Sequence, residues 1–245
     1  MNRTARKIIM VVAASVFLFS SFMVLKQYLE SRTGVKYSET ISEMSVVLPT
    51  ENLEQKHADV IEVDFDILCA QNQDVVAWIY CPDTPINYPI VQTSDNEFYL
   101  NHLLNGSNNS AGTLFMDYRN AEDLSDWNSV IYGHNMKNDS MFGTLSNYKE
   151  QSYFESHPVI YLLTQEQNYK INVLAGFVTP AISELYSAFN PNEEEKASFI
   201  KSWLNASDFN SGICPALESR LITLSTCSYE YNDARYVLVG VLETF

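Results

Sequence analysis

The chain begins with a short basic segment followed by a long apolar run. Eighteen uncharged residues extend from Ile8 to Leu25, and three basic side chains lie among the seven residues before them. At about 1.5 Å per helical residue the run spans roughly 27 Å, enough to cross the hydrocarbon layer of a membrane. We therefore predict a cytoplasmic segment over 1–7, a transmembrane anchor over 8–25 and an external C-terminal part, because basic residues favour the cytoplasmic side.

A cleaved signal peptide is the alternative interpretation of the same run. Signal peptides have an apolar core of about 7–15 residues that ends at a small-x-small cleavage site. Here the run is longer, and its end, SFMVLKQYLE, contains no A-x-A pattern. Lys26, Arg32 and Lys36 follow the span and weaken the charge bias, but the length and the missing cleavage site favour a retained anchor.

The next segment, 26–70, is predominantly polar. From Lys26 to about Glu62 the residues Glu, Ser and Lys recur among isolated apolar positions, which is typical of a stalk. The later part, ENLEQKHADVIEVDFDILCAQN, has apolar residues at mixed spacings of three and four and predicts one or two amphipathic helices packed on the following domain. One globular domain is expected over 71–245, since this length suffices for a single sizeable core.

From Val75 onward the pattern changes to short β-rich runs separated by polar turn clusters. Eight runs are present: VVAWIY, YPIVQ, GTLFMDY, SVIYGH, VIYLL, YKINVLAGFV, RLITLSTC and RYVLVGVLE. Their regular spacing predicts a mainly β domain, a barrel or closed sandwich, and not a parallel α/β sheet. The segment PNEEEKASFIKSWLNAS lies between the sixth and seventh runs and predicts a helix with Pro191 in its first turn.

The charge balance excludes one class of partner. The formal net charge is −15, from 15 basic and 30 acidic residues. A nucleic-acid partner is not expected, because phosphate binding requires a basic surface. The acidic run 193–195 indicates a solvated helix start and not a calcium site. We therefore expect neither a metal ion nor a cofactor.

Four scattered cysteines form neither a disulfide scaffold nor a CxxC zinc motif. A disulfide between Cys69 and Cys81 remains open, because an external domain can form one. Cys227 differs from the others, since it ends the apolar run LITLST and is followed by the polar segment SYEYND. A free cysteine is ordinarily a buried packing residue, but a thiol delivered by a strand to the start of a polar loop is also suited to nucleophilic chemistry.

Two further residues lie at strand ends. His134 closes the run NSVIYGH, and Arg235 opens RYVLVGVLE eight residues after Cys227. If the last two runs pair as a hairpin, the guanidinium of Arg235 returns alongside the thiol. A histidine beside a thiol exchanges protons with it and with a leaving amine, and a fixed cation stabilises an oxyanion. Solvated side chains are the alternative for each residue alone, so the prediction depends on all three together.

These residues resemble the signature of the sortases. TLSTC at 223–227 followed by Arg235 is similar to the sortase pattern TLxTC…R, and YGHNMKNDSMFG at 132–143 is similar to the sortase histidine region. The similarity extends through WIYCPDTPINYPIVQTSDNEFYLNHLL and AGTLFMDYRN and covers roughly 75–243. The longer motifs resemble class B in particular.

The resemblance carries expectations that the residue pattern alone does not. It implies an eight-stranded sortase-type β-barrel with N-terminal helices and a helix inserted between strands 6 and 7. It also implies a cysteine transpeptidase that cleaves a C-terminal sorting signal of a secreted protein and holds the acyl fragment as a thioester. An amine on peptidoglycan, or on a lipid-linked wall precursor, then resolves the thioester on the outer face of a Gram-positive plasma membrane. His134, Cys227 and Arg235 fall on the catalytic positions.

The resemblance also suggests residues of the substrate groove. Ser225 occupies the variable position of TLxTC, and the alternation of side chains along a strand places it on the same face as Cys227. Asn96, Thr179 and Tyr186 are expected in the groove by family likeness. Packing or capping is the alternative role for each.

Two other interpretations remain open. An L,D-transpeptidase-like wall enzyme also uses a histidine, a cysteine and an arginine, but that family places Gly before the cysteine and Arg within two residues after it. Here Thr226 precedes Cys227, and Arg235 is eight residues away. A membrane-tethered β-domain that only binds ligands is the second alternative, because the function must be argued from the site and not from the fold.

Overall fold

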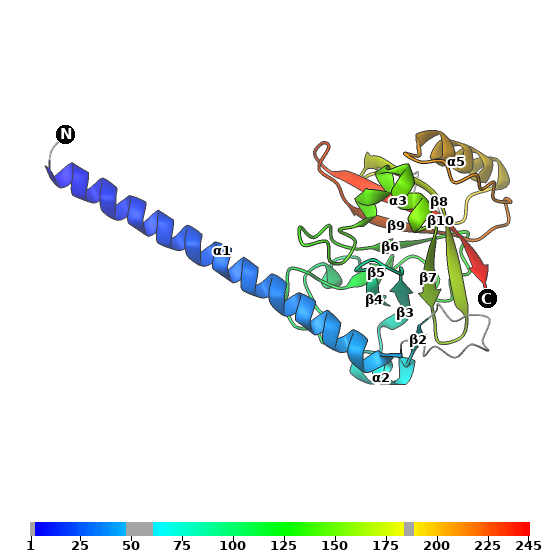
Figure 1. Ribbon diagram of the computed structural model, residues 1–245, viewed down its shortest axis with the longest axis horizontal. Coiled ribbons are helices and arrows are strands. Elements are labelled where there is room, and N and C mark those ends of the chain that lie inside the picture. The colour runs from blue at the N-terminus through cyan, green and yellow to red at the C-terminus, as the bar shows by residue number, and fades with distance from the viewer. Residues whose placement is uncertain (1–2, 48–60, 184–188) are drawn as a thin grey trace.

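The computed structural model describes residues 3–47, 61–183 and 189–245. A long helix projects from one side of a globular domain built around a closed sheet (Figure 1). The helix α1 (Arg3–Ser45) is continuous through the predicted anchor and through the first half of the polar segment. At about 1.5 Å per residue, its 43 residues extend roughly 64 Å.

All eight β-rich runs form strands of one closed barrel. The order around the barrel is β10, β8, β7, β3, β4, β5, β6, β9, with parallel pairing only between β4 and β5 and between β6 and β9 among the described strands. The predicted eight-stranded barrel is therefore confirmed. The strands are β3 (Val75–Tyr80), β4 (Asn87–Val91), β5 (Leu114–Met116), β6 (Asn128–Tyr132), β7 (Val159–Leu163), β8 (Asn168–Pro180), β9 (Leu221–Cys227) and β10 (Ala234–Thr244).

Short helices connect several of the strands. The 3-10 turn η1 lies between β4 and β5, and the 3-10 turn η2 and the helix α3 lie between β6 and β7. Only one of the predicted amphipathic helices lies within the described residues, and part of that prediction falls on 48–60, outside them. The elements are β1 (Val46–Val47), β2 (Glu62–Val63), α2 (Phe65–Gln71), η1 (Phe98–Leu100), η2 (Leu145–Lys149) and α3 (Gln151–Ser156).

Alternation along β9 divides its side chains between two cores. Ile222 and Leu224 point into the barrel, where they join the largest buried cluster. Leu221 points outward into a second cluster with Val237 and Trp203. Because side chains alternate along a strand, Cys227 shares the outer face with Leu221. The nucleophile candidate therefore lies outside the barrel, at the polar end of a face whose other end is apolar.

The helix α5 (Glu193–Ala206) covers the apolar end of that outer face. It lies between the sixth and seventh barrel strands, as predicted, and buries Trp203 completely. The prediction that Pro191 lies in the first turn is wrong by two residues. Asn192 is the N-cap and forms a capping box with Glu195, so the helix begins at Glu193, where the cap satisfies the free backbone N–H groups.

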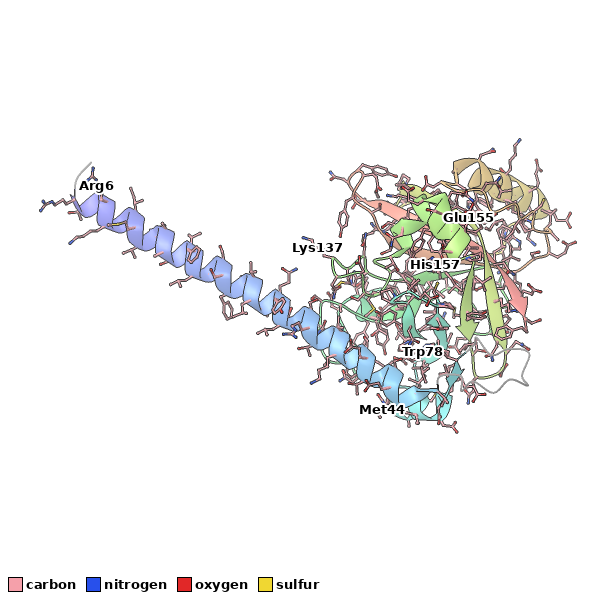
Figure 2. All side chains as sticks on the ribbon, viewed as in Figure 1. Arg6, Met44, Trp78, Lys137, Glu155 and His157 are labelled. Atoms are coloured by element: carbon pink, nitrogen blue, oxygen red, sulfur yellow. The ribbon has the colours of Figure 1, made fainter. Side chains whose placement is uncertain are left out.

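The C-terminal part of α1 packs on the barrel. Tyr37 and Ile41 enter a third buried cluster that includes Trp78, which Figure 2 labels within the domain. Asn109 donates a hydrogen bond to the carbonyl of Glu30 (2.9 Å). The segment 30–45 is thus a docked helix, although its composition alone predicted a stalk. Its mostly exposed polar side chains match that composition, while a few buried positions carry the packing.

Candidate active site

The two strands at the end of the chain bring Cys227 and Arg235 together. They are direct partners in the antiparallel pair of β9 and β10. The next pair outward, Ser228 and Ala234, is joined by a backbone hydrogen bond of 2.9 Å, so Cys227 and Arg235 form a non-hydrogen-bonded pair. Side chains of such pairs lie on one face with Cβ atoms roughly 4.5–5.5 Å apart. The hairpin expected from the sequence is therefore present.

The parallel pairing of β6 and β9 brings His134 to the other side of Cys227. Tyr132 is paired with Ser225, and the backbone N–H of Gly133 donates to the carbonyl of Ser225 (3.1 Å). Two residues further along both strands, His134 is level with Cys227. Adjacent strands are about 4.8 Å apart, so the three side chains form a row across three neighbouring strand ends.

Side-chain hydrogen bonds fix these strand ends to one another. Thr226 donates from its hydroxyl to the carbonyl of Gly133 (2.8 Å). Asn135 donates from its amide to the carbonyl of Cys227 (2.7 Å). Thr226 and Gly133 immediately precede the two reactive residues, and Asn135 immediately follows His134. The relative positions of the thiol and the imidazole are therefore set by hydrogen-bonded backbone and not by a free loop.

The row of side chains opens into a pocket. Its empty volume, including the open mouth, is about 670 Å³. All three predicted catalytic residues and two of the predicted groove residues contribute to its wall. The lining residues are Asn96, Leu100, Phe115, Tyr132, Gly133, His134, Ala181, Ser225, Thr226, Cys227 and Arg235.

The imidazole of His134 is oriented by a backbone carbonyl. Its Nε2 lies 2.7 Å from the carbonyl oxygen of Leu100, which can only accept a hydrogen bond. Nε2 therefore carries the proton, and Nδ1 is the nitrogen free to gain or lose one. This contact could not be predicted from the sequence, because a main-chain carbonyl leaves no signal in residue type.

The predicted groove residues differ in their placement. Ser225 is buried in the pocket wall, and its hydroxyl has no hydrogen-bond partner within the described part of the chain. Thr179 is the direct partner of Arg235 on β8 but does not line the pocket, which Ala181 lines instead. Tyr186 lies outside the described residues. Ser225 therefore belongs to the pocket wall with a buried hydroxyl, whereas Thr179 lies on the strand beside Arg235.

A buried carboxylate that was not predicted from the sequence holds two residues of the pocket wall. Asp117 follows β5 and is fully buried. It accepts hydrogen bonds from the amide of Asn96 (3.0 Å) and the hydroxyl of Tyr132 (2.9 Å), both pocket residues. The Arg119 side chain reaches Asp117 through Nε (2.9 Å) and Nη2 (2.7 Å). An acidic residue directly after an apolar run and two positions before an arginine was the available signal.

The hydrogen bonds also set the ionisation of Asp117. Burial alone would raise the pKa of this carboxyl, but hydrogen bonds from Arg119 and Tyr132, together with the charge of Arg119, lower the pKa overall. Asp117 is therefore ionised and holds the Asn96 amide in one orientation. The carbonyl oxygen of that amide accepts the backbone N–H of Tyr118 (3.0 Å), so both ends of the group are fixed.

The cysteines and acidic groups give no further site. All four cysteines are free thiols in this structure, including Cys69 and Cys81, whose pairing was left open. Residues 193–195 form the first turn of α5, as expected. Within 3–47, 61–183 and 189–245, no group of three or more His, Cys, Asp or Glu side chains could hold a metal ion.

Comparison with known proteins identifies the family of the chain. Residues 79–243 match the family described as Sortase domain. The chain belongs to the sortase family. Sortase B of Listeria monocytogenes is 30% identical over 241 residues, which cover 97% of this chain and 96% of that protein. Sortase B of Staphylococcus aureus is 25% identical over 234 residues.

Solved structures agree with class B in particular. Sortase B from Bacillus anthracis in complex with AAEK1 superposes with a TM-score of 0.74 at 31% identity and covers 90% of this chain and 100% of that chain. A Staphylococcus aureus sortase B–substrate complex superposes with a TM-score of 0.70 at 29% identity, covering 74% of this chain and 84% of that one. This sortase is therefore a class B sortase, and sortases are cysteine transpeptidases that act at the cell surface.

Proposed function

We propose that this sortase cleaves a C-terminal sorting signal of secreted proteins through a thioester and joins the proteins to a cell-wall amine. The observation that carries the proposal is the row of His134, Cys227 and Arg235 across three adjacent strand ends in one pocket. A thiol nucleophile, a proton carrier and a cation are the groups that acyl transfer from an amide requires.

The first half-reaction forms the thioester. The thiolate of Cys227 attacks the scissile carbonyl carbon, and the carbonyl oxygen becomes an oxyanion that the guanidinium of Arg235 stabilises. His134 donates a proton from Nδ1 to the leaving amine, while its Nε2–H remains on the carbonyl of Leu100. The C–N bond breaks, and the acyl group remains on sulfur.

The second half-reaction uses an amine of peptidoglycan or of a lipid-linked wall precursor. The amine attacks the thioester carbon, His134 accepts its proton, and the thiolate of Cys227 leaves. The unpartnered hydroxyl of Ser225 and the fixed amide of Asn96 lie in the same pocket and are suited to hold the backbone of the sorting signal. The orientation of the Asn96 amide is already determined by its bonds to Asp117 and to the backbone of Tyr118.

We place the enzyme at the plasma membrane of a Gram-positive bacterium, anchored by 8–25, with 1–7 cytoplasmic and 71–245 external. Length and composition support the anchor: α1 is long and apolar enough to cross a membrane, and the residues of its apolar run are unburied in the structure. No charged side chain interrupts the apolar run, and the side chains there are exposed on every face of the helix. No nucleic-acid partner is expected for this acidic chain.

The two alternatives are less well supported. An L,D-transpeptidase-like enzyme does not agree with the sortase family match over 79–243. Ligand binding alone does not require a thiol, an imidazole and a guanidinium in one row at the ends of three strands, whereas acyl transfer requires all three groups.

The test uses the full-length enzyme in detergent micelles with a library of quenched peptides that carry sorting-like motifs. Each peptide is incubated with and without an amine acceptor, and Cys227→Ala is the control. Cleavage that depends on Cys227 and yields an amine-linked product would establish transpeptidation and reveal the motif. A Cys227→Ala variant that cleaves as well as the wild type would refute the mechanism, and binding without cleavage would favour the ligand-binding alternative.

A further inference from the structure

Three exposed side chains with large apolar surfaces lie on two neighbouring segments at the active-site end of the barrel. Ile182 is 99% exposed, Tyr229 76% and Tyr231 46%. The loop that carries the two tyrosines joins β9 to β10, and its Asp233 carbonyl accepts a hydrogen bond from the backbone N–H of Ala181 (2.8 Å). Because this bond joins the loop to the end of β8, the three side chains, here called the apolar rim, are carried by two adjoining segments. Single exposed apolar residues are common, but a cluster beside an active site requires an explanation.

The position of this surface relative to α1 is fixed by contacts. Asn109 binds the Glu30 carbonyl (2.9 Å), and Asn87 donates to the Ser42 hydroxyl (2.8 Å). These bonds lie twelve residues apart on one helix, about 18 Å, so they prevent the domain from pivoting about a single point. The C-terminal part of α1 and the domain are therefore packed along a length of helix and not at one point.

The domain also approaches the apolar run of α1 directly. Leu25 and Asn108 line a common hollow between helix and domain. Glu30 lies five residues beyond Leu25, a rise along the helix of only about 7.5 Å. A membrane that contains 8–25 would therefore have the near side of the catalytic domain against its headgroups.

The apolar rim lies on that near side. In Figure 1 the loop between β9 and β10, drawn in red-orange, projects toward the side on which the N-terminal half of α1 extends, and α5 lies at the far side of the domain. Lys137, in the loop that follows His134, also lies on the side toward the helix (Figure 2). The loops on both sides of the nucleophile thus face the same direction as the anchor.

The chemistry of the loop fits the boundary between lipid and water. Tyrosine has an apolar ring and a polar hydroxyl and is enriched at membrane interfaces. Glu230, between the two tyrosines, is paired with the ammonium of Lys149 and accepts the hydroxyl of Ser228, so its charge is already compensated. Asp233 is the other carboxylate of the loop. Because an anionic lipid surface would repel its charge, a zwitterionic surface with no net charge is the better partner.

We propose that the apolar rim, with Tyr229 and Tyr231 at its tip, inserts into the lipid headgroup layer that anchors α1, so that the active-site mouth opens at the membrane surface. This inference rests on the proposed membrane anchor. A sorting signal that remains associated with the membrane, or an acceptor on a lipid carrier, would then reach Cys227 without leaving the surface.

The experiment measures the depth of single tryptophans in the full-length enzyme reconstituted in nanodiscs of brominated phosphatidylcholine. Tyr229→Trp and Tyr231→Trp report on the rim, Phe22→Trp reports on the anchor, and Leu204→Trp on α5 is a surface control far from the membrane. The native tryptophans are buried, and the wild-type signal is subtracted. We expect the bromolipid to quench the added fluorescence at positions 22, 229 and 231 and not at 204.

The outcomes distinguish a failure of the rim contact from a failure of the membrane anchor. Quenching at 22 with both rim positions as bright as 204 would overturn the rim contact and leave the anchor intact. No quenching at 22 would refute the anchor and with it the rim contact. In a parallel assay, the Tyr229→Ser, Tyr231→Ser double variant should keep the wild-type KM for a soluble peptide. A raised KM without quenching would overturn the membrane contact in favour of a peptide-binding role.

Discussion

Replacing Asp117 with Asn tests whether this buried carboxylate holds the substrate wall. The change removes the charge and converts one acceptor oxygen into an N–H donor while keeping the size of the side chain. On the Oδ2 side the new donor would face the amide of Asn96 and the hydroxyl of Tyr132, and on the Oδ1 side the backbone and side chain of Arg119. In either orientation donors oppose donors.

The magnitude follows from these contacts. Removing one partner of a buried ion pair costs about 3–5 kcal/mol. The side chain of Arg119 is 47% exposed, so water replaces part of what it loses, and we expect the low end, about 3 kcal/mol. At about 2–4 °C per kcal/mol for a chain of this size, the melting temperature should fall by roughly 6–12 °C.

Activity should fall as well, because the Asn96 amide loses its fixed orientation. A lost hydrogen bond of about 0.5–1.5 kcal/mol to the transition state lowers kcat/KM about 2- to 12-fold. The matched control is Asp126→Asn. Asp126 also accepts several hydrogen bonds, from Asn120, Ala121 and Asn190, but does not line the pocket. The control should lower stability and leave kcat/KM unchanged at temperatures where the protein is folded.

Thermal unfolding of the full chain in detergent, followed by circular dichroism, gives the stability change, and peptide cleavage gives kcat/KM. A melting temperature lowered by less than about 2 °C, which corresponds to less than about 1 kcal/mol, would contradict the role assigned to Asp117 in the fold. Equal losses of activity in Asp117→Asn and Asp126→Asn would contradict its role in orienting Asn96.

Three further predictions follow from the site. Arg235→Ala should slow turnover roughly 100- to 1000-fold, because one oxyanion donor contributes about 2.7–4 kcal/mol. Arg235→Lys should restore only part of the rate, since an ammonium lacks the planar guanidinium that donates two parallel hydrogen bonds. Near-normal single-turnover rates in the alanine variant would exclude Arg235 from stabilising the oxyanion. Gly133→Ala should destabilise the fold by about 1–3 kcal/mol, because its Cβ would collide with the core side chains of Leu114 and Phe142. Chemical denaturation measures this change, and an unchanged midpoint would contradict it. Lys149→Glu or Glu230→Lys alone should lower stability and the charge-swapped double variant should recover it. The Lys149 partner lowers the pKa of Glu230 to about 2, so this contribution is present above the ordinary carboxyl pKa and is lost as the pH falls toward 2. Additive single and double effects in a pH-resolved thermal melt would show that the pair does not interact.

The strands could be predicted because each run is apolar, β-branched and bounded by turn residues. The hairpin of β9 and β10 followed from chain order, and it placed Arg235 beside Cys227. The parallel pairing of β6 with β9 could not be deduced in this way, since nothing local in either strand specifies a partner about 90 residues away. The position of His134 beside the thiol therefore depended on the family resemblance.

Errors at the helices have local causes. Pro191 is favoured in a first helical turn, but Asn192 caps the helix more effectively through its side chain, and the helix begins after it. The polar composition of 26–45 concealed a helix whose buried positions are few, with Gly34 and Ile41 among them. Asp117 was missed because its importance comes from Asn96 and Tyr132, which the fold brings to it from other segments.

The order of the strands in the closed barrel has a consequence for when the enzyme becomes active. The final strand, β10, is hydrogen-bonded to both β8 and β9, and it carries Arg235. A chain whose synthesis has not reached this strand has an open sheet and a thiol without its cation. Pairings between distant segments form late in folding, because loop-closure entropy opposes them. Closing the barrel with β10 and bringing Arg235 beside Cys227 are therefore one and the same step, so the catalytic row cannot form before the sheet has closed.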